Sequence, residues 1–258
     1  MDVATSSVRQ GYVLGLADDA LVAAQRMGEW IAASPQIEED VALGNIGLDL
    51  LGQARSLLTY AGSLETPVRT EDDLAYWRDE HEFRNVHLVE RPTADYAVAM
   101  ARLLVLSTYL CELYALLRSS TDGTLAAVAA KAVKEVDYHR DHAAMWVLRL
   151  GDGTDESHRR MQAALNTVWP YLEELFRTSD VERRLAGAGV AVDPADVRDE
   201  VDAVLDEVIT RATLTRPTIP GIGTIGGRSG RQGLHTEYLG HVLAEMQSLA
   251  RQHQGATW

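Results

Sequence analysis

Apolar residues recur along most of this chain at the spacing of amphipathic helices, and no stretch alternates with the period of a β-strand. The pattern therefore predicts an all-α fold. Long helices are expected over residues 6–31, 34–60, 93–119, 124–150, 155–176, 193–214 and 232–252. The highly charged stretch 71–90 is interpreted as a short helix and an exposed corner, and another short helical piece is expected at 181–185. Residues 216–230, with two prolines and five glycines, form the one long irregular segment.

The helix expected over 34–60 is apolar almost all the way round, which is typical of a central helix. It contains Gly44, Gly47 and Gly52. Each glycine costs about 1 kcal/mol relative to alanine inside a helix. We expect another helix to approach closely at these glycines and to compensate for that cost.

Length and composition limit the classes of protein to which this chain can belong. The 258 residues suffice for one large core, so we expect a single domain over 1–258, with residues 1–7 disordered. The formal charge of −14 argues against a broad surface for nucleic acid or anionic membrane. Cys111 is the only cysteine, the N-terminus does not resemble a signal peptide, and no uncharged apolar run is long enough to cross a bilayer. These features favour a cytoplasmic protein.

The spacing of the histidines bears on metal chemistry. Four-helix di-iron sites take Glu-x-x-His pairs from two helices, because side chains at i and i+3 project together into the core. Of the eight histidines, only His158 has an acid three residues earlier, Asp155, and that pair follows a Gly-Asp-Gly-Thr turn. It is therefore interpreted as the opening of a helix, and the sequence lacks the ligand pattern of a di-iron enzyme.

Several polar residues nevertheless fall within apolar stretches. Asn45 and Asp49 lie one turn apart, and Glu29 lies near the end of the first helix. Burying Asn45 and Asp49 unpaired would cost several kcal/mol, so these two residues need partners. A metal ion is one answer and an ion pair with Arg26 or Arg55 is the other. The absence of Glu-x-x-His favours the ion pair.

A second polar set lies on the helix expected over 124–150. Glu135, His139 and His142 share one helical face. The order His, Glu, His that a zinc protease requires is missing, so hydrogen bonding within the helix is favoured over metal ligation.

The last helix carries a third set of polar residues. His235, Glu237, His241 and Glu245 lie along it at helical spacing. They either complete a site together with the second set or form a polar seam that fixes helix register, and the seam is favoured. In the form favoured here, Asp49, Glu135, His139 and Glu237 build a buried polar network where a metal site would otherwise lie.

Phosphate-binding patterns are weak. The glycine-rich segment 221–230 fits neither the Walker pattern nor the dinucleotide fingerprint. Arg78 and Arg84, and the pair Arg183 and Arg184, could receive phosphates, although surface arginines are usually only solvated. Cys111 lies among apolar neighbours without an adjacent base and is interpreted as a packing residue.

Taken together, the motifs resemble the family of C subunits of the bacterial ring-1,2-phenylacetyl-CoA epoxidases, over essentially residues 8–258. The resemblance rests on QRMGEW (25–30), LGNIGLDLLGQAR (43–55), KAVKE (131–135), YH (138–139), GDGTD (151–155), GVAVDP (189–194), GLHTE (233–237) and LAEMQ (243–247).

The resemblance implies a ferritin-like helical bundle and a non-catalytic structural role. In that family the di-iron site lies in a separate catalytic (A) subunit, and a reductase with flavin and iron–sulfur groups delivers electrons from NADPH. The C subunits resemble relatives of the catalytic one that lost their metal ligands, so no cofactor is expected in this chain. The degenerate site would comprise Glu29, Asp49, Glu135, His139, Glu237 and His241.

The resemblance also implies that phenylacetyl-CoA binds near the interface between the catalytic and structural subunits. The substrate-contact candidates are Glu82, Phe83, Arg84, Asn85, Arg183, Arg184 and Leu185. Further epoxidase subunits are expected as partners, and a homodimer stays open for the isolated chain. Two alternatives remain: a component of an oxygenase with its own unusual ligand set, and an unrelated ferritin-like scaffold protein.

Overall fold

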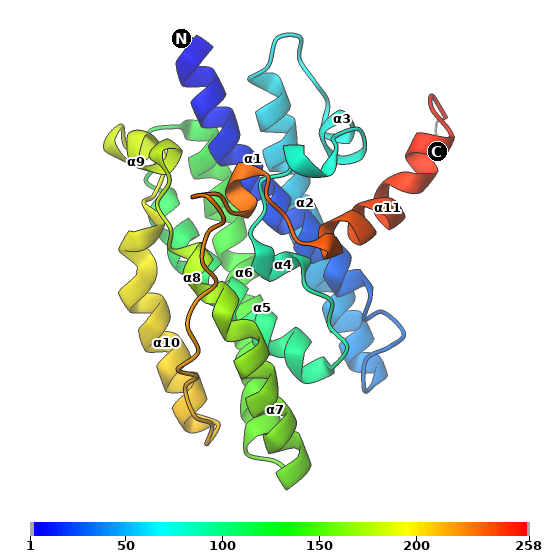
Figure 1. Cartoon of the computed structure of the whole chain (residues 1–258), viewed down its shortest axis with the longest axis vertical. Coiled ribbons are helices and arrows are strands. Elements are labelled where there is room, and N and C mark those ends of the chain that lie inside the picture. Colours follow the sequence, from blue (N-terminus) through cyan, green and yellow to red (C-terminus); the bar gives the residue numbers. More distant parts are fainter. Residues whose placement is uncertain (1–2, 257–258) are drawn as a thin grey trace. The chain divides into compact units, whose positions relative to one another are not determined.

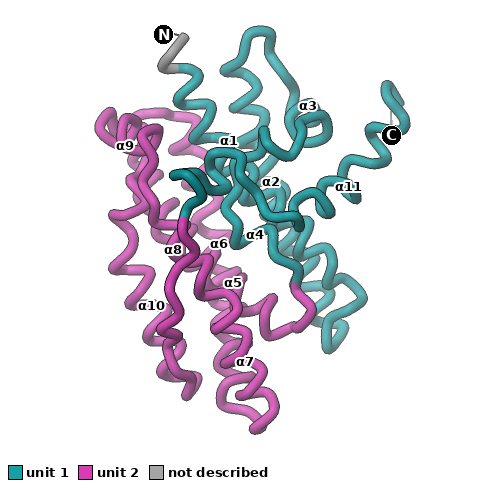
Figure 2. The backbone as a smooth tube through the Cα atoms, in the orientation of Figure 1, with its two compact units in different colours: residues 1–92, 224–258 teal, residues 93–223 magenta. Residues whose placement is uncertain are grey.

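The computed structural model describes residues 3–256, and the described part is all-α, as predicted (Figure 1). An isolated bridge between Ile225 and Arg228 is the only β-pairing among these residues. This composition agrees with the expected ferritin-like bundle. The chain divides into two compact units, residues 1–92 with 224–258 and residues 93–223 (Figure 2).

The first unit is built on the antiparallel helices α1 (Val3–Gly28) and α2 (Ile37–Ser63), which pack along most of their length. The short elements α3 (Glu71–Tyr76), η1 (Glu80–Glu82) and α4 (His87–Glu90) follow. From the far end of the chain, η4 (Gly230–Gln232) and α11 (Glu237–Gln252) return to this unit, where α11 contacts α1, α3, η1 and α4.

The second unit is built on α5 (Tyr96–Leu117) and α6 (Gly123–Gly151), which also pack on one another. The elements that follow are α7 (Asp155–Val168), η2 (Trp169–Tyr171), α8 (Leu172–Leu175), α9 (Asp180–Gly187), η3 (Pro194–Val197) and α10 (Arg198–Arg211). Both α7 and α10 pack against α5 and α6.

Side-chain caps set many helix starts, as the sequence suggested for Asp193 and Pro194. Asp122 accepts hydrogen bonds from the amides of Thr124 and Leu125 at the start of α6. Ser179 and Glu182 form a reciprocal capping box at α9. Asp193 accepts from the amide of Ala195, just ahead of the proline that opens η3.

Several predicted boundaries were wrong, for local reasons. The first helix ends at Gly28, because Ala32 adopts φ +66° and Asp40 accepts hydrogen bonds from the amides of Ala32 and Ser34. The helix expected over 155–176 breaks at η2, where Pro170 has no amide hydrogen to donate. Helix α1 already begins at Val3, inside the segment 1–7 expected to be disordered, because no proline or glycine interrupts residues 3–10.

Two interpretations of burial also need correction. Helix α2 is not central on all sides, since Ile37, Val41 and Leu48 are exposed. The charged stretch 71–90 is not simply an exposed corner, because several of its side chains are fully buried, among them Arg78 and Glu90. The close helix approach is confirmed at Gly47, where an added Cβ would lie 3.4 Å from the Cβ of Met27 in α1.

The most apolar helix is α5. It is long and apolar enough to meet the length and composition test for a membrane span, and 83% of that window is buried inside the protein. Burial of this kind is what a core helix of the all-α fold requires.

Candidate functional site

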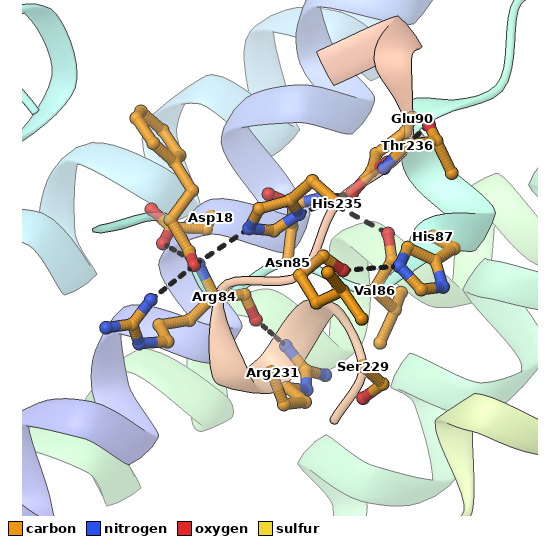
Figure 3. Close-up of polar contacts among 12 residues, drawn as sticks. Asp18, Arg84, Asn85, Val86, His87, Glu90, Ser229, Arg231, His235 and Thr236 are labelled. Atoms are coloured by element: carbon orange, nitrogen blue, oxygen red, sulfur yellow. Dashed lines mark hydrogen bonds and ion pairs between the residues drawn. The ribbon is translucent and has the colours of Figure 1, made fainter. Parts of the chain in front are cut away.

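The first unit contains a buried polar cluster drawn from three segments that are distant in sequence (Figure 3). Its carboxylates come from α1 and α4, and its cations come from the segment 78–84 and from residues 231–235. We define the buried polar cluster as Asp18, Asp19, Arg78, Arg84, Asn85, Glu90, Arg231, His235 and Thr236.

Asp18 and Arg78 form a fully buried ion pair. Both oxygens of Asp18 accept from the two terminal nitrogens of Arg78, with Nη1 2.9 Å from Oδ2. The backbone amide of Arg84 donates to the same Oδ2 at 2.8 Å. The Arg78 guanidinium also lies 4.1 Å from the centroid of the Phe83 ring. A two-pronged pair of this kind fixes orientation as well as charge, so it holds the segment 78–84 against α1.

Asp19 faces the returning C-terminal segment. Arg231 Nη2 lies 2.6 Å from its Oδ2, and the amide of Val86 donates to its Oδ1 at 2.8 Å. Burial raises the pKa of the Asp19 carboxyl to about 6, even though Arg231 and the Val86 amide act in the opposite direction. The other terminal nitrogen of Arg231 donates to the carbonyls of Gly15 and Arg84.

Glu90 is the acceptor at the centre of the cluster. Its Oε1 accepts from Asn85 Nδ2 at 2.9 Å and lies 2.6 Å from His235 Nδ1. Its Oε2 accepts from both the amide and the hydroxyl of Thr236, at 2.8 and 2.6 Å. Four donors therefore satisfy one fully buried carboxylate, which leaves no lone pair directed at a ligand.

His235 is held through both ring nitrogens. Nδ1 faces the Glu90 carboxylate, and Nε2 lies 3.0 Å from the carbonyl oxygen of Phe83, which can only accept. The ring therefore links Glu90 of α4 and the Phe83 carbonyl to the segment that leads into α11.

Gly233 permits this connection. It adopts φ +72°, and a Cβ at this position would lie 2.2 Å from the carbonyl oxygen of His81 and 2.8 Å from Arg84 Nη1. Only glycine combines that backbone conformation with so close an approach.

The predicted metal-site residues do not assemble into a buried network. Glu29, Glu237 and His241 are exposed, and Glu29 forms an ion pair with Arg26. Asp49 is half-buried on α2. Glu135 forms a 3.1 Å ion pair with Lys131 one turn earlier on α6, while His139 is buried. The prediction that Glu237 belongs to a buried network was wrong, because the first turn of α11 presents this residue to solvent.

The donor set does not fit a di-iron centre. Within residues 3–256, no three or more His, Cys, Asp and Glu side chains gather in a way that could hold a metal ion. The buried carboxylates of the first unit instead bind arginine, histidine, hydroxyl and amide donors. That this chain binds no metal therefore stays a prediction to be tested directly.

The predicted substrate contacts lie in two different settings. Phe83 and Asn85 are fully buried, Glu82 and Arg84 are half-buried, and all four flank the buried polar cluster. On α9, Leu185 is buried, whereas the arginines Arg183 and Arg184 are exposed, and Arg183 pairs with Asp180. No observation tests either set as a ligand contact.

Cys111 is buried in α5, and burial raises the pKa of its thiol to about 12. The interpretation of Cys111 as a packing residue is confirmed.

Sequence reasoning missed Asp18, Asp19 and Glu90. A signal was present for the first two, since adjacent aspartates interrupt a run of otherwise apolar residues between 12 and 24. Unpaired carboxylates cannot remain in such a run, so partners were required. No comparable signal marks Glu90, which is one of many charged residues within the stretch 71–90.

The chain has relatives among known proteins over nearly its full length. The profile of a family described as phenylacetic acid catabolic protein matches residues 2–258. A relative from Escherichia coli (strain K12), named as the C subunit of 1,2-phenylacetyl-CoA epoxidase, is 44% identical over 247 residues. The match covers 96% of this chain and 98% of the relative.

Proposed function

This chain belongs to the phenylacetic acid catabolic protein family, and we propose that it is a non-catalytic structural subunit of a 1,2-phenylacetyl-CoA epoxidase. The family confirms the resemblance inferred from the sequence motifs. In the proposed complex, the di-iron centre lies in a separate catalytic subunit, and a reductase with flavin and iron–sulfur groups takes electrons from NADPH. The proposed location of this chain is the cytoplasm.

The pairing of the buried carboxylates supports the non-catalytic role. A metal ligand must keep an oxygen lone pair free for the ion, with its other contacts made by supporting groups. Asp18 is bound on both oxygens by Arg78, and Glu90 receives four donors. These groups hold helices and segments together. The proposed role of the chain in a complex is therefore to offer a stable surface that another subunit can bind.

Of the predicted substrate contacts, Arg84 is the residue best suited to bind a phosphate. Its guanidinium is half-buried and donates to the carbonyls of His81 and Phe83 through Nη1. Burial lowers its pKa, and the nearby cations Arg78 and Arg228 act in the same direction. Among the described residues, neither Arg84 nor Arg228 forms an ion pair with a carboxylate, so both guanidinium groups keep their charge available for an anion. We propose that this pair, rather than the exposed Arg183 and Arg184, attracts the phosphates of the thioester.

Reconstitution tests the proposed function. The catalytic subunit is assayed with the reductase for epoxidation of phenylacetyl-CoA in the presence and absence of this chain, and the complex is isolated by affinity chromatography. We expect stable copurification of the two proteins, activity only when both are present, and none from this chain with the reductase. Full activity without this chain would contradict the structural role.

The contact with the thioester has its own test. We expect Arg84→Glu and Arg228→Glu to raise KM for phenylacetyl-CoA about tenfold each while kcat and copurification stay unchanged, because a phosphate contact made equally in ground and transition states affects binding alone. Arg183→Glu with Arg184→Glu is the matched control. A rise in KM only in that control would move the contact to α9.

A further inference from the structure

Helix α2 carries aliphatic side chains on two opposite faces. One face, with Leu43, Ile46, Leu50 and Leu57, is buried. The other face exposes Ile37, Val41 and Leu48, which are 74%, 61% and 66% exposed. These three residues follow one another at intervals of four and seven, so they share one side of the helix.

A residue outside the helix extends this face. Ile31, in the turn between α1 and α2, is 56% exposed. Its Cδ1 lies 3.9 Å from the point that a Cβ of Gly44 would occupy, which places it over α2 between Val41 and Leu48 along the sequence. We define the α2 apolar surface as Ile31, Ile37, Val41 and Leu48. Contiguous exposed aliphatic groups of this kind mark interaction sites in soluble proteins.

The surroundings of the α2 apolar surface are acidic. Glu38 is exposed in the first turn of α2, and Asp40 and Asp49 are half-buried along the helix. Glu29 is also exposed nearby, although Arg26 pairs with it. Two copies meeting face to face about a two-fold axis would bring these acids against each other, in a protein that already carries a net charge of −14. Charge complementarity therefore selects a different partner, one whose apolar contact is bordered by arginine or lysine.

We propose that the α2 apolar surface docks an apolar helix, bordered by basic side chains, of another subunit of the same complex. This inference rests on the proposed function, because membership in a multisubunit epoxidase supplies the partner. It also explains why the sequence of α2 is apolar almost all round: one face serves the fold of this chain and the other serves the assembly.

Paired substitutions test the surface. Val41→Glu with Leu48→Glu places two charges on it, and Val68→Glu with Leu249→Glu places two charges on similarly exposed aliphatic positions of the same unit. Affinity for the catalytic subunit is measured by biolayer interferometry on purified full-length chains. We expect the α2 pair to weaken binding at least about a hundredfold, because charges desolvated in an apolar contact find no partner, and the control pair to change it less than about threefold.

The acidic border is tested separately. Glu38→Lys should weaken binding by about three- to tenfold and should reduce its salt dependence, as expected for a complementary charge at the rim of an interface. Unchanged or tighter binding by Glu38→Lys would overturn the basic chemistry assigned to the partner.

The remaining outcomes also decide the inference. Wild-type affinity in the α2 pair, or an equal loss in the control pair, overturns it while the proposed function stands. Should the glutamates lower the melting temperature, Val41→Asn with Leu48→Gln takes their place. A homodimer of the isolated chain that only the α2 pair disrupts, seen by light scattering, would overturn the inference and assign the surface to a second copy. Failure of the wild-type chain to bind the catalytic subunit would overturn the proposed function itself.

Discussion

At the scale of single residues, Glu90 shows how one carboxylate can join two distant segments of chain. Its donors come from Asn85 on its own segment and from His235 and Thr236, more than 140 positions later. Because the other ring nitrogen of His235 lies 3.0 Å from the Phe83 carbonyl oxygen, His235 holds the C-terminal segment at two points. A surface ion pair contributes little to stability, but removing a buried acceptor leaves its donors without partners.

Glu90→Gln should therefore be strongly destabilising. The amide preserves shape but replaces one acceptor oxygen with an NH2 donor, which would face the donors that Glu90 now satisfies. We expect a loss of about 3 kcal/mol in the free energy of unfolding. Urea denaturation followed by circular dichroism measures it. Glu207→Gln is the control, because the pair of Glu207 with Arg211 is well exposed and should be worth less than about 1 kcal/mol. Equal, small effects in both variants would show that the buried contacts of Glu90 contribute no more to stability than an exposed ion pair.

The raised pKa of Asp19 predicts how the stability of the protein changes with pH. Its carboxyl titrates near 3.8 in the unfolded chain and at about 6 in the folded protein. Between these values the unfolded chain releases a proton that the folded protein keeps, so rising pH favours unfolding; above about 6 both states are ionised and the effect is complete. Relative to Asp19→Asn, which cannot titrate, the wild type should lose about 2 kcal/mol of stability between pH 4 and 6.5.

Denaturation of both proteins across that pH range checks the sign. Other titrating groups contribute equally to the two proteins and cancel in the difference. If the wild type instead gains stability over Asp19→Asn as the pH rises, the attraction of Arg231 outweighs the burial of the carboxyl.

The residues of the candidate site were only partly predictable. Arg84 and Asn85 were named through the resemblance, whereas the ion pair of Glu29 with Arg26 was not predicted. The prediction for Glu237 was wrong because a helical pattern places a residue on a face of the helix without showing which face is covered. Glu90 was missed because its burial depends on His235 and Thr236, whose approach cannot be predicted from local sequence.

At the scale of elements, the sequence predicted which helices exist better than it predicted the residues at which they begin and end. The long helices follow from apolar periodicity, and Asp193 with Pro194 was recognised as a helix start. The errors lie where backbone geometry is unusual. Helix α11 begins at Glu237 rather than near residue 232, because Ser229 and Gln232 close a separate turn and Gly233 then adopts a left-handed conformation.

Gly233→Ala isolates the importance of that turn. The substitution introduces both an unfavourable φ and a collision with the His81 carbonyl, and we expect it to cost about 3 kcal/mol, the sum of the two effects. Gly226→Ala is the matched control, since Gly226 also has positive φ (+59°) but has no atom within 4 Å of the added Cβ. It should cost only about 1 kcal/mol. Thermal melts of the two variants would disagree with this account if they shifted equally.

At the scale of the whole molecule, the fold class and family could be inferred from the sequence. The all-α architecture follows from the helical spacing of apolar residues, and the motifs that indicated the family lie along nearly the full chain. The division into two compact units, with residues 224–258 returning to the N-terminal unit, was not foreseen. It depends on contacts such as Arg231 with Asp19, which join residues more than 200 positions apart.

The metal content of the whole protein is the last prediction, and it separates a structural subunit from an enzyme with an unusual ligand set. The carboxylates Asp18 and Glu90 are already occupied by protein donors, and Glu-x-x-His pairs are missing from the sequence. We expect less than about 0.1 iron per chain by mass spectrometric metal analysis after expression in iron-rich medium, with the catalytic subunit prepared in parallel as the positive control. Treatment with a chelator should leave the melting temperature of this chain unchanged, because a metal that bound the folded state would stabilise it by mass action. One or two irons per chain, lost together with thermal stability on chelation, would identify a metal centre in this protein and remove the basis for its non-catalytic role.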